Sequence, residues 1–208
     1  MESKVLPMRK KYKIHPIEIA LYFKWGDFTY SAKNEIFNEI WLKREGLIFY
    51  SFQDKLQFKK KIDNALYFLE EKDYEKEFAD IKNILQDTDN KYTEECMWDE
   101  YSDVESFFKL IKLKLTFTPN TPVVRKKLRK LLMELGYQKR SWQLVDKIKK
   151  SCKALGISTF VRGGKECDIG KVDIDDWISF RLTEYRKFNI SSILHFIRRK
   201  IHKVYHSK

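Results

Sequence analysis

Glycine and proline are scarce in this sequence of 208 residues, which contains seven glycines and four prolines. Neither residue occurs between Leu47 and Thr118. Because these residues are the strongest interruptions of regular backbone structure, their absence leaves room for long helices in that stretch. The sequence also lacks internal repeats and low-complexity tracts, and its hydrophobic content of 43% is sufficient for a packed core.

Cysteine is also rare, and long apolar runs are missing. The three cysteines, Cys96, Cys152 and Cys167, are scattered and odd in number, so we expect reduced thiols and no disulfide framework. No apolar run approaches the roughly 20 residues needed to span a bilayer. Residues 1–16 lack the apolar core of a secretory signal peptide. We therefore expect a cytoplasmic protein with no membrane association.

Residue patterns that carry enzymatic chemistry are largely missing. The only adjacent glycines, Gly163 and Gly164, do not make a phosphate-cradling loop, and no serine or cysteine lies in a recognisable nucleophile motif. His195 and His202 share a helical face, but no cysteine or acid is placed to complete a zinc site. We therefore expect no enzyme activity, no metal and no cofactor.

One cluster of acids raises a metal-dependent nuclease as a further alternative. Such an enzyme needs carboxylates that hold divalent ions near the scissile phosphate. A restriction-type nuclease also needs an acid-x-Lys pair on the next strand, and residues 184–186, Glu-Tyr-Arg, match it poorly. The clustered acids are Asp168, Asp173, Asp175, Asp176 and Glu184.

Residues 121–182 have the clearest pattern in the chain, beginning with two basic helices. Thr121 is suited to begin the first helix and Gly136 to end it. Ser141 and Gly156 are suited to bound the second in the same way. Apolar residues at helical spacing predict the buried side of the first helix: Val124, Leu128, Leu131, Leu132 and Leu135. The corresponding residues of the second helix are Trp142, Val145, Ile148, Cys152 and Leu155.

A strand, a turn and a return strand follow these helices. Residues 157–161 favour a short strand, Gly163-Gly164 is a strong turn signal, and residues 172–180 favour an apolar return strand. Upstream, Ser102 with a glutamate three residues later predicts the start of another helix. Residues 115–118 then alternate like a short strand before Pro119.

This order of elements, over about 102–182, resembles the winged helix-turn-helix module shared by many DNA-binding proteins. The resemblance implies that the helix beginning at Ser141 recognises DNA and that the strands form the wing. One feature departs from the pattern. A wing that contacts DNA is usually basic, whereas residues 166–168 and 173–176 are rich in acids. The departure suggests that the wing faces away from the duplex.

The charge favours a nucleic-acid partner. The formal net charge is +12, and residues 109–165 hold sixteen Lys or Arg against two acids. A recognition helix presents its N-terminal residues to base edges, and Arg and Gln can each pair with a base through two hydrogen bonds. The alternatives are a solvated basic face and a protein-docking module. The predicted duplex-DNA contacts are Arg125, Lys126, Arg129, Lys130, Gln138, Lys139, Arg140, Ser141, Gln143, Lys147, Lys150, Arg162, Lys165, Arg198 and Arg199.

An acidic segment, residues 62–106, holds fifteen acids against four lysines. It is interpreted as a solvated helical face, as a segment that folds back on the basic module, or as a docking surface for a basic protein. The last interpretation makes the alternative function that of an interaction or inhibitor protein, such as a phage-encoded antagonist of a nucleic-acid enzyme. Its contact residues would be Glu94, Glu95, Asp99 and Glu100.

The expected fold class is therefore mainly α with a small β-wing (α+β). Residues 1–101 form a helical N-terminal region that supplies a partner or self-association surface. Residues 102–182 form the winged-helix-like module. Residues 183–208 form a basic C-terminal helix.

Overall fold

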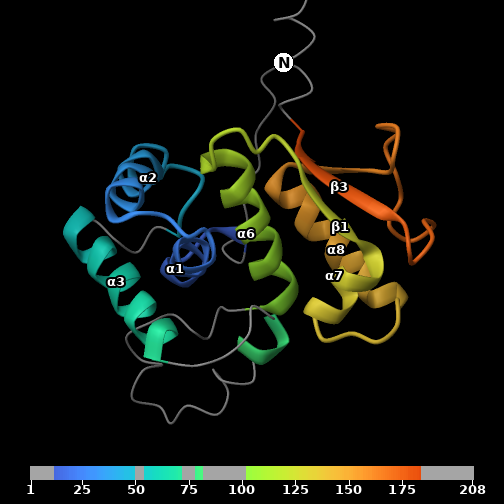
Figure 1. Cartoon of the computed structure of the whole chain (residues 1–208), viewed down its shortest axis with the longest axis horizontal. Coiled ribbons are helices and arrows are strands. Elements are labelled where there is room, and N and C mark those ends of the chain that lie inside the picture. Colours follow the sequence, from blue (N-terminus) through green and yellow to red (C-terminus); the bar gives the residue numbers. More distant parts are fainter. Residues whose placement is uncertain (1–11, 50–53, 72–77, 82–101, 184–208) are drawn as a thin grey trace, which may run out of the picture.

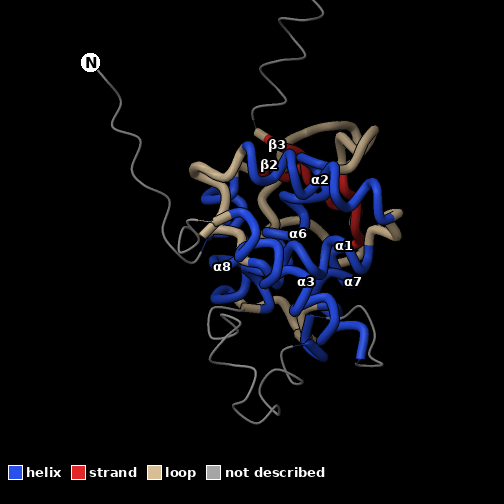
Figure 2. Tube along the Cα trace, turned by 90° about the vertical axis from the view of Figure 1, so that its left-hand side faces the viewer, coloured by secondary structure: helices blue, strands red, loops and turns tan. Residues whose placement is uncertain are grey.

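The computed structural model describes residues 12–49, 54–71, 78–81 and 102–183 (Figure 1). They form a mainly helical structure with one three-stranded antiparallel sheet, which confirms the predicted α+β composition (Figure 2). None of the described helices is long and apolar enough to cross a membrane. The elements are α1 (Pro16–Trp25), α2 (Tyr30–Leu42), α3 (Lys55–Glu71), α6 (Asp103–Phe117), β1 (Val124–Lys127), α7 (Leu128–Glu134), α8 (Trp142–Leu155), β2 (Ile157–Phe160) and β3 (Trp177–Leu182).

Helix α6 lies at the centre of the molecule, between α1 and the elements from β1 to β3 (Figure 1). It begins after Ser102, as predicted, and nearly all of its apolar side chains are buried. Aromatic side chains on α6 pack edge to face against both neighbouring parts of the molecule. Phe107 contacts Phe78, and Phe108 contacts Phe180 of β3. One cluster of buried side chains therefore runs from the N-terminal helices to the sheet, across the predicted boundary at residue 102.

The strand predicted at 115–118 is wrong, because α6 continues to Phe117. An alternation over only four residues is weak evidence for a strand. The apolar side of the helix outweighs it, because that side continues through Leu113 to Phe117, and both residues are buried. The Thr116 hydroxyl donates a hydrogen bond to the carbonyl of Lys112 at 2.8 Å, which is a helical i−4 contact. Pro119 follows directly after the cap residue and prevents the helix from continuing.

The predicted start of the next helix is also wrong. Thr121 does not cap a helix; residues 124–127 form strand β1, and α7 begins at Leu128. The reason is tertiary, because β1 pairs with β3, which lies some fifty residues away in the sequence. The first backbone N–H groups of α7 donate hydrogen bonds to loop carbonyls. The N–H of Leu128 donates to the carbonyl of Asp176 at 3.0 Å, and the N–H of Arg129 donates to that of Ile174 at 2.8 Å. The predicted end is confirmed, since Gly136 has a φ of +73°.

Helix α8 has the predicted bounds. The Ser141 hydroxyl accepts a hydrogen bond from the backbone N–H of Leu144, and Gly156 takes the left-handed conformation that ends the helix. Ile148, Cys152 and Leu155 are buried as predicted. Trp142, which was also predicted to be buried, is 76% exposed. It is the first residue of the helix.

The sheet has the order β1-β3-β2, so the last strand lies between the other two. β3 begins at Trp177, five residues later than the predicted return strand. The inner face of the sheet packs against the core through Ile178 and Phe180, which are fully buried. Helix α6 contacts β3 and helix α8 contacts β2, so these two helices cover the inner face.

Candidate nucleic-acid interface

Helices α7 and α8 form a pair whose solvent-facing side is basic. The buried residues of the pair are apolar apart from Ser151, and the residues between them along each helix are exposed or half-buried. The structure therefore brings most of the predicted contacts of this region onto the solvent side of one helix–turn–helix. The exposed predicted contacts on these elements are Arg129, Lys130, Gln138, Lys139, Gln143, Lys147 and Lys150.

Several of these basic side chains already have acidic partners. Lys126, on β1, contacts both carboxylate oxygens of Glu134 at 2.6 and 2.7 Å and is largely covered. Arg129 makes a two-pronged pair with Asp175, with both nitrogen–oxygen distances at 2.8 Å. These hydrogen bonds lower the pKa of the Asp175 carboxyl. A phosphate at these positions would compete with a carboxylate that is already bound.

Two predicted base contacts also have structural roles. The Arg140 guanidinium donates from Nη1 to the carbonyls of Ile169, at 3.1 Å, and Val172. The Ser141 hydroxyl caps α8. Arg140 thus ties the start of the proposed recognition helix to the segment that leads into β3.

The acids that depart from the basic-wing pattern hold this same segment in place. Asp168 pairs with Lys149 of α8 at 2.7 Å and accepts the backbone N–H of Gly170 at 2.8 Å. Its pKa is lowered, first by the bond from Lys149. Asp173 and Asp176 accept backbone N–H groups within the turn before β3. These acids therefore bind helices and turns of their own chain.

The tip of the hairpin after β2 is basic. The backbone N–H of Val161 donates to the carbonyl of Lys165 at 3.0 Å, and Phe160 forms a bridge with Glu166. Arg162 and Lys165 are exposed at this tip. The intervening Gly163-Gly164 turn is confirmed, since both residues have positive φ angles. Glu166, the first acid of the wing, lies in the hairpin directly after Lys165, and the other acids follow it in the chain.

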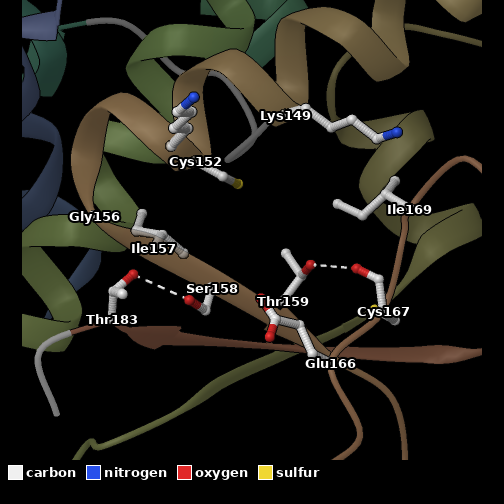
Figure 3. Close-up of a pocket in the computed structure, with 11 residues that line it drawn as sticks. Lys149, Cys152, Gly156, Ile157, Ser158, Thr159, Glu166, Cys167, Ile169 and Thr183 are labelled. Atoms are coloured by element: carbon white, nitrogen blue, oxygen red, sulfur yellow. Dashed lines mark hydrogen bonds between the residues drawn. The ribbon is translucent and has the colours of Figure 1, made fainter. Parts of the chain in front are cut away.

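A cavity of about 520 Å³ lies between α8 and β2 (Figure 3). Several of its polar side chains already have partners within the protein. Lys149 forms an ion pair with Asp168, the Thr159 hydroxyl donates a hydrogen bond to the Cys167 carbonyl, and the Ser158 and Thr183 hydroxyls share a hydrogen bond. Burial raises the pKa of the Cys152 thiol, which keeps it protonated and a poor nucleophile. Cys152 therefore supplies no reactive thiolate to this cavity.

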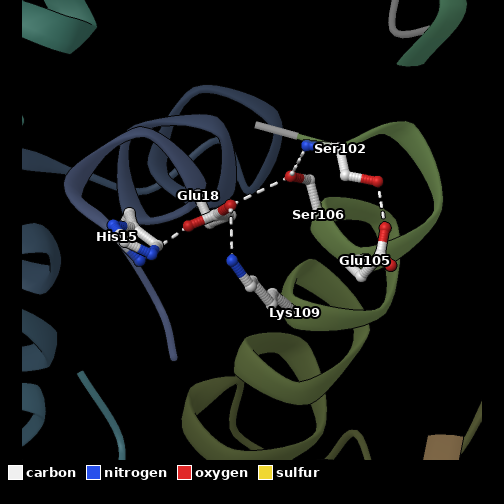
Figure 4. A network of polar contacts seen from close by, with 6 residues as sticks. All are labelled: His15, Glu18, Ser102, Glu105, Ser106 and Lys109. Carbon is white, nitrogen blue, oxygen red and sulfur yellow. Dashed lines mark hydrogen bonds and ion pairs between the residues drawn. The ribbon is translucent and has the colours of Figure 1, made fainter. Parts of the chain in front are cut away.

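Lys109, in the basic stretch, is inaccessible to any partner. It is fully buried and pairs with the equally buried Glu18 of α1 at 3.2 Å (Figure 4). Glu18 also accepts hydrogen bonds from the Ser106 hydroxyl at 2.9 Å and from the His15 backbone N–H at 2.6 Å. This polar cluster fastens α1 to α6.

The remaining predicted residues, Arg198, Arg199, Glu94, Glu95, Asp99 and Glu100, lie outside the described part of the chain. Among the described residues, His, Cys, Asp and Glu side chains form no group of three that could hold a metal ion. Compared with known proteins, the chain matches no family model, no curated protein and no solved structure.

Proposed function

We propose that this protein binds duplex DNA through the α7–α8 helix pair, in the manner of a winged helix-turn-helix protein. The observation that carries the proposal is the topology. The order α6-β1-α7-α8-β2-β3 and the antiparallel sheet order β1-β3-β2 support the proposal, because a winged-helix module is expected to combine three helices with a three-stranded sheet and a wing.

The surface of α8 supports this role. Its buried side anchors the helix to α6 and β2, which leaves Gln143, Lys147 and Lys150 exposed along the opposite side. Gln143 lies in the first turn, where a helix that enters the major groove contacts base edges. Lys147 and Lys150 lie one and two turns further on, where they would contact phosphates.

The wing tip supplies a second contact. Arg162 and Lys165 are exposed on a short hairpin, and two of the acids that follow, Asp168 and Asp175, pair with Lys149 and Arg129. The acidic composition of the wing region is therefore compatible with a basic, DNA-contacting tip.

The test measures duplex affinity as a function of salt. Each neutralised phosphate contributes about −0.9 to the slope of log K against log salt concentration. Replacing Lys130, Lys139 and Lys147 together by Gln should weaken binding and make the slope shallower by about 0.9 for each phosphate that the variant no longer neutralises.

A matched variant controls for net charge. It replaces Lys33, Lys55 and Lys60 of α2 and α3 by Gln, which removes the same charge from helices outside the proposed interface. Equal losses of affinity in the two variants would show that net charge binds the DNA and that α7–α8 is not the interface. Absence of duplex binding at low salt would refute the proposal outright.

A second candidate function is docking of a protein partner, the alternative raised by the acidic segment. Exposed apolar side chains favour it: Tyr30, Leu42, Leu56 and Tyr67 of α2 and α3 are between 59% and 78% exposed. Tyr67 lies within the acidic segment itself. In this alternative, duplex binding is absent at low salt and a Tyr67→Ser variant loses its partner in a pull-down.

A further inference from the structure

The outer face of the sheet combines basic and aromatic side chains. In the antiparallel register, Arg125 lies opposite Ser179, Lys127 opposite Trp177, and Ser158 opposite Arg181. Residues opposite one another point to the same side of a sheet. Phe160, also opposite Ser179, is buried yet is not part of the core cluster, because it lies on this outer face. The strands β1, β2 and β3 contain no acid, and Glu166, which forms a bridge with Phe160, lies at the border of this face.

A groove of about 420 Å³ follows this face. Its lining includes Arg125 of β1, Arg181 and Trp177 of β3, and Arg162 of the hairpin tip. Ser179 and the Gly163-Gly164 turn complete it. A Cβ at either glycine would meet no atom within 4 Å, so the backbone there is open to a ligand.

The arginines of the groove differ from four of the other basic side chains of the module. Arg129, Lys126, Lys149 and Lys150 each have a carboxylate between 2.6 and 2.8 Å away. Within the described chain, Arg125, Arg162 and Arg181 have no carboxylate at salt-bridge distance. Three guanidinium groups that line one groove, none of them paired with a described carboxylate, form a site for a polyanion, and Arg suits phosphate oxygens particularly well.

The aromatic side chains define the ligand further. Trp177 is 52% exposed at the edge of the groove, and the Lys127 ammonium lies 5.9 Å from its ring centroid. The Arg181 guanidinium lies 5.1 Å from the Phe160 ring centroid, so Phe160 supports Arg181 from below. An exposed indole beside phosphate-binding groups can stack on a nucleobase.

We propose that this groove binds a single-stranded polynucleotide, with phosphates on Arg125, Arg162 and Arg181 and one base stacked on Trp177. A duplex does not fit this chemistry, because its base faces are covered by their neighbours in the stack. The groove lies on the sheet face opposite α6 and α8. The inference therefore goes beyond duplex binding by α8 and does not depend on it, and Arg162 of the wing tip is the one residue that both proposals use.

The experiment titrates the full-length protein into a labelled oligothymidylate of about ten nucleotides, within the range of known single-strand site sizes. Trp177→Ala should weaken this binding roughly 5- to 150-fold, as expected for the loss of one stacked base. Trp177→Phe keeps an aromatic face and should retain much of the affinity. Arg162→Gln, at an exposed turn, should weaken binding and make its salt dependence shallower.

The control is Trp142→Ala, which removes another highly exposed tryptophan, at the start of α8. We expect it to leave oligothymidylate binding unchanged. If Trp177→Ala and Trp142→Ala bind the oligonucleotide equally well, or if the unaltered protein does not bind it at low salt, the inference is wrong.

A duplex of the same length, titrated in parallel, separates the two proposals. Loss of duplex binding in the α7–α8 lysine variant, with oligothymidylate binding intact, supports two separate sites. Oligothymidylate binding that depends on Trp177 without any duplex binding would refute the proposed function and retain this inference. Equal dependence of both ligands on Trp177 would refute single-strand selectivity.

Discussion

At the scale of single residues, the buried pair of Glu18 and Lys109 shows how a charged side chain can belong to the core. Both side chains are fully buried, and Ser106 and the His15 backbone supply further hydrogen bonds to the carboxylate. A buried ion pair is retained only where such bonds compensate for the loss of hydration. The pair joins α1 to α6 and so links the two halves of the chain.

We predict that Lys109→Met destabilises the protein by about 3–5 kcal/mol, because it leaves a buried carboxylate without its cation. The double variant Lys109→Met with Glu18→Gln should recover part of this loss, since the amide still accepts a hydrogen bond and carries no charge. Urea unfolding of the variants measures both effects.

The exposed pair of Lys43 and Glu39 on α2 provides the comparison. Lys43→Met should cost at most about 1 kcal/mol, because an exposed ion pair contributes little. Similar destabilisation by Lys43→Met and Lys109→Met would contradict the role assigned to the buried pair.

At the scale of elements, α8 is positioned from both sides. Its apolar face rests on α6 and β2, while Arg140 and Lys149 bind the segment between the wing tip and β3. That segment in turn supplies the carbonyls that accept the first N–H groups of α7. The helix pair and the wing are therefore mutually dependent.

We predict that Arg140→Ala loosens the segment 167–176. Loss of hydrogen bonds from a charged donor costs about 1.5–3 kcal/mol locally, which raises the population of open conformations. Limited digestion with trypsin, with fragments identified by mass, should show faster cleavage after Lys171, which is exposed in this segment.

The neighbouring residue supplies the control for this digestion. Lys139 is also exposed and precedes α8, so Lys139→Ala should leave cleavage after Lys171 at its original rate. If Arg140→Ala does the same, the guanidinium does not hold the segment.

At the scale of the whole molecule, the acidic segment and the basic module carry opposite charges. We predict that neutralising Glu94, Glu95, Asp99 and Glu100 together tightens duplex binding at low salt, because these charges compete with DNA for the basic surface. The gain should shrink near physiological salt, where the Debye length is roughly 8 Å. Duplex titrations at the two salt concentrations measure it.

A matched set of acids controls for net charge in these titrations. Neutralising Asp27, Glu35, Glu39 and Glu45, which lie in α2 and in the turns after α1 and α2, removes the same charge. An equal gain there would indicate a net-charge effect. Unchanged duplex affinity at low salt would contradict competition. Unchanged affinity combined with loss of a protein partner in a pull-down would favour the docking alternative.

Local signals in the sequence were sufficient for the helices that are bounded by their own residues. Ser141 and Gly156 bound α8 and Gly136 ends α7, because capping and left-handed conformations depend on one or two nearby residues. Ser102 directly precedes α6 as predicted, but its side chain makes no capping hydrogen bond. The mainly helical class and the basic character of α7–α8 followed from periodicity and charge in the same way.

Tertiary structure decided the features that depend on distant residues. Residues 124–127 became a strand because β3 pairs with them, and α7 begins at Leu128 because the carbonyls of Ile174 and Asp176 accept its first N–H groups. The same pairing brings Arg125, Arg181 and Trp177 to one groove. Composition determined that the chain is basic, but only the fold determined which cations are neutralised by carboxylates, because ion pairing acts over a few ångströms between residues far apart in the sequence.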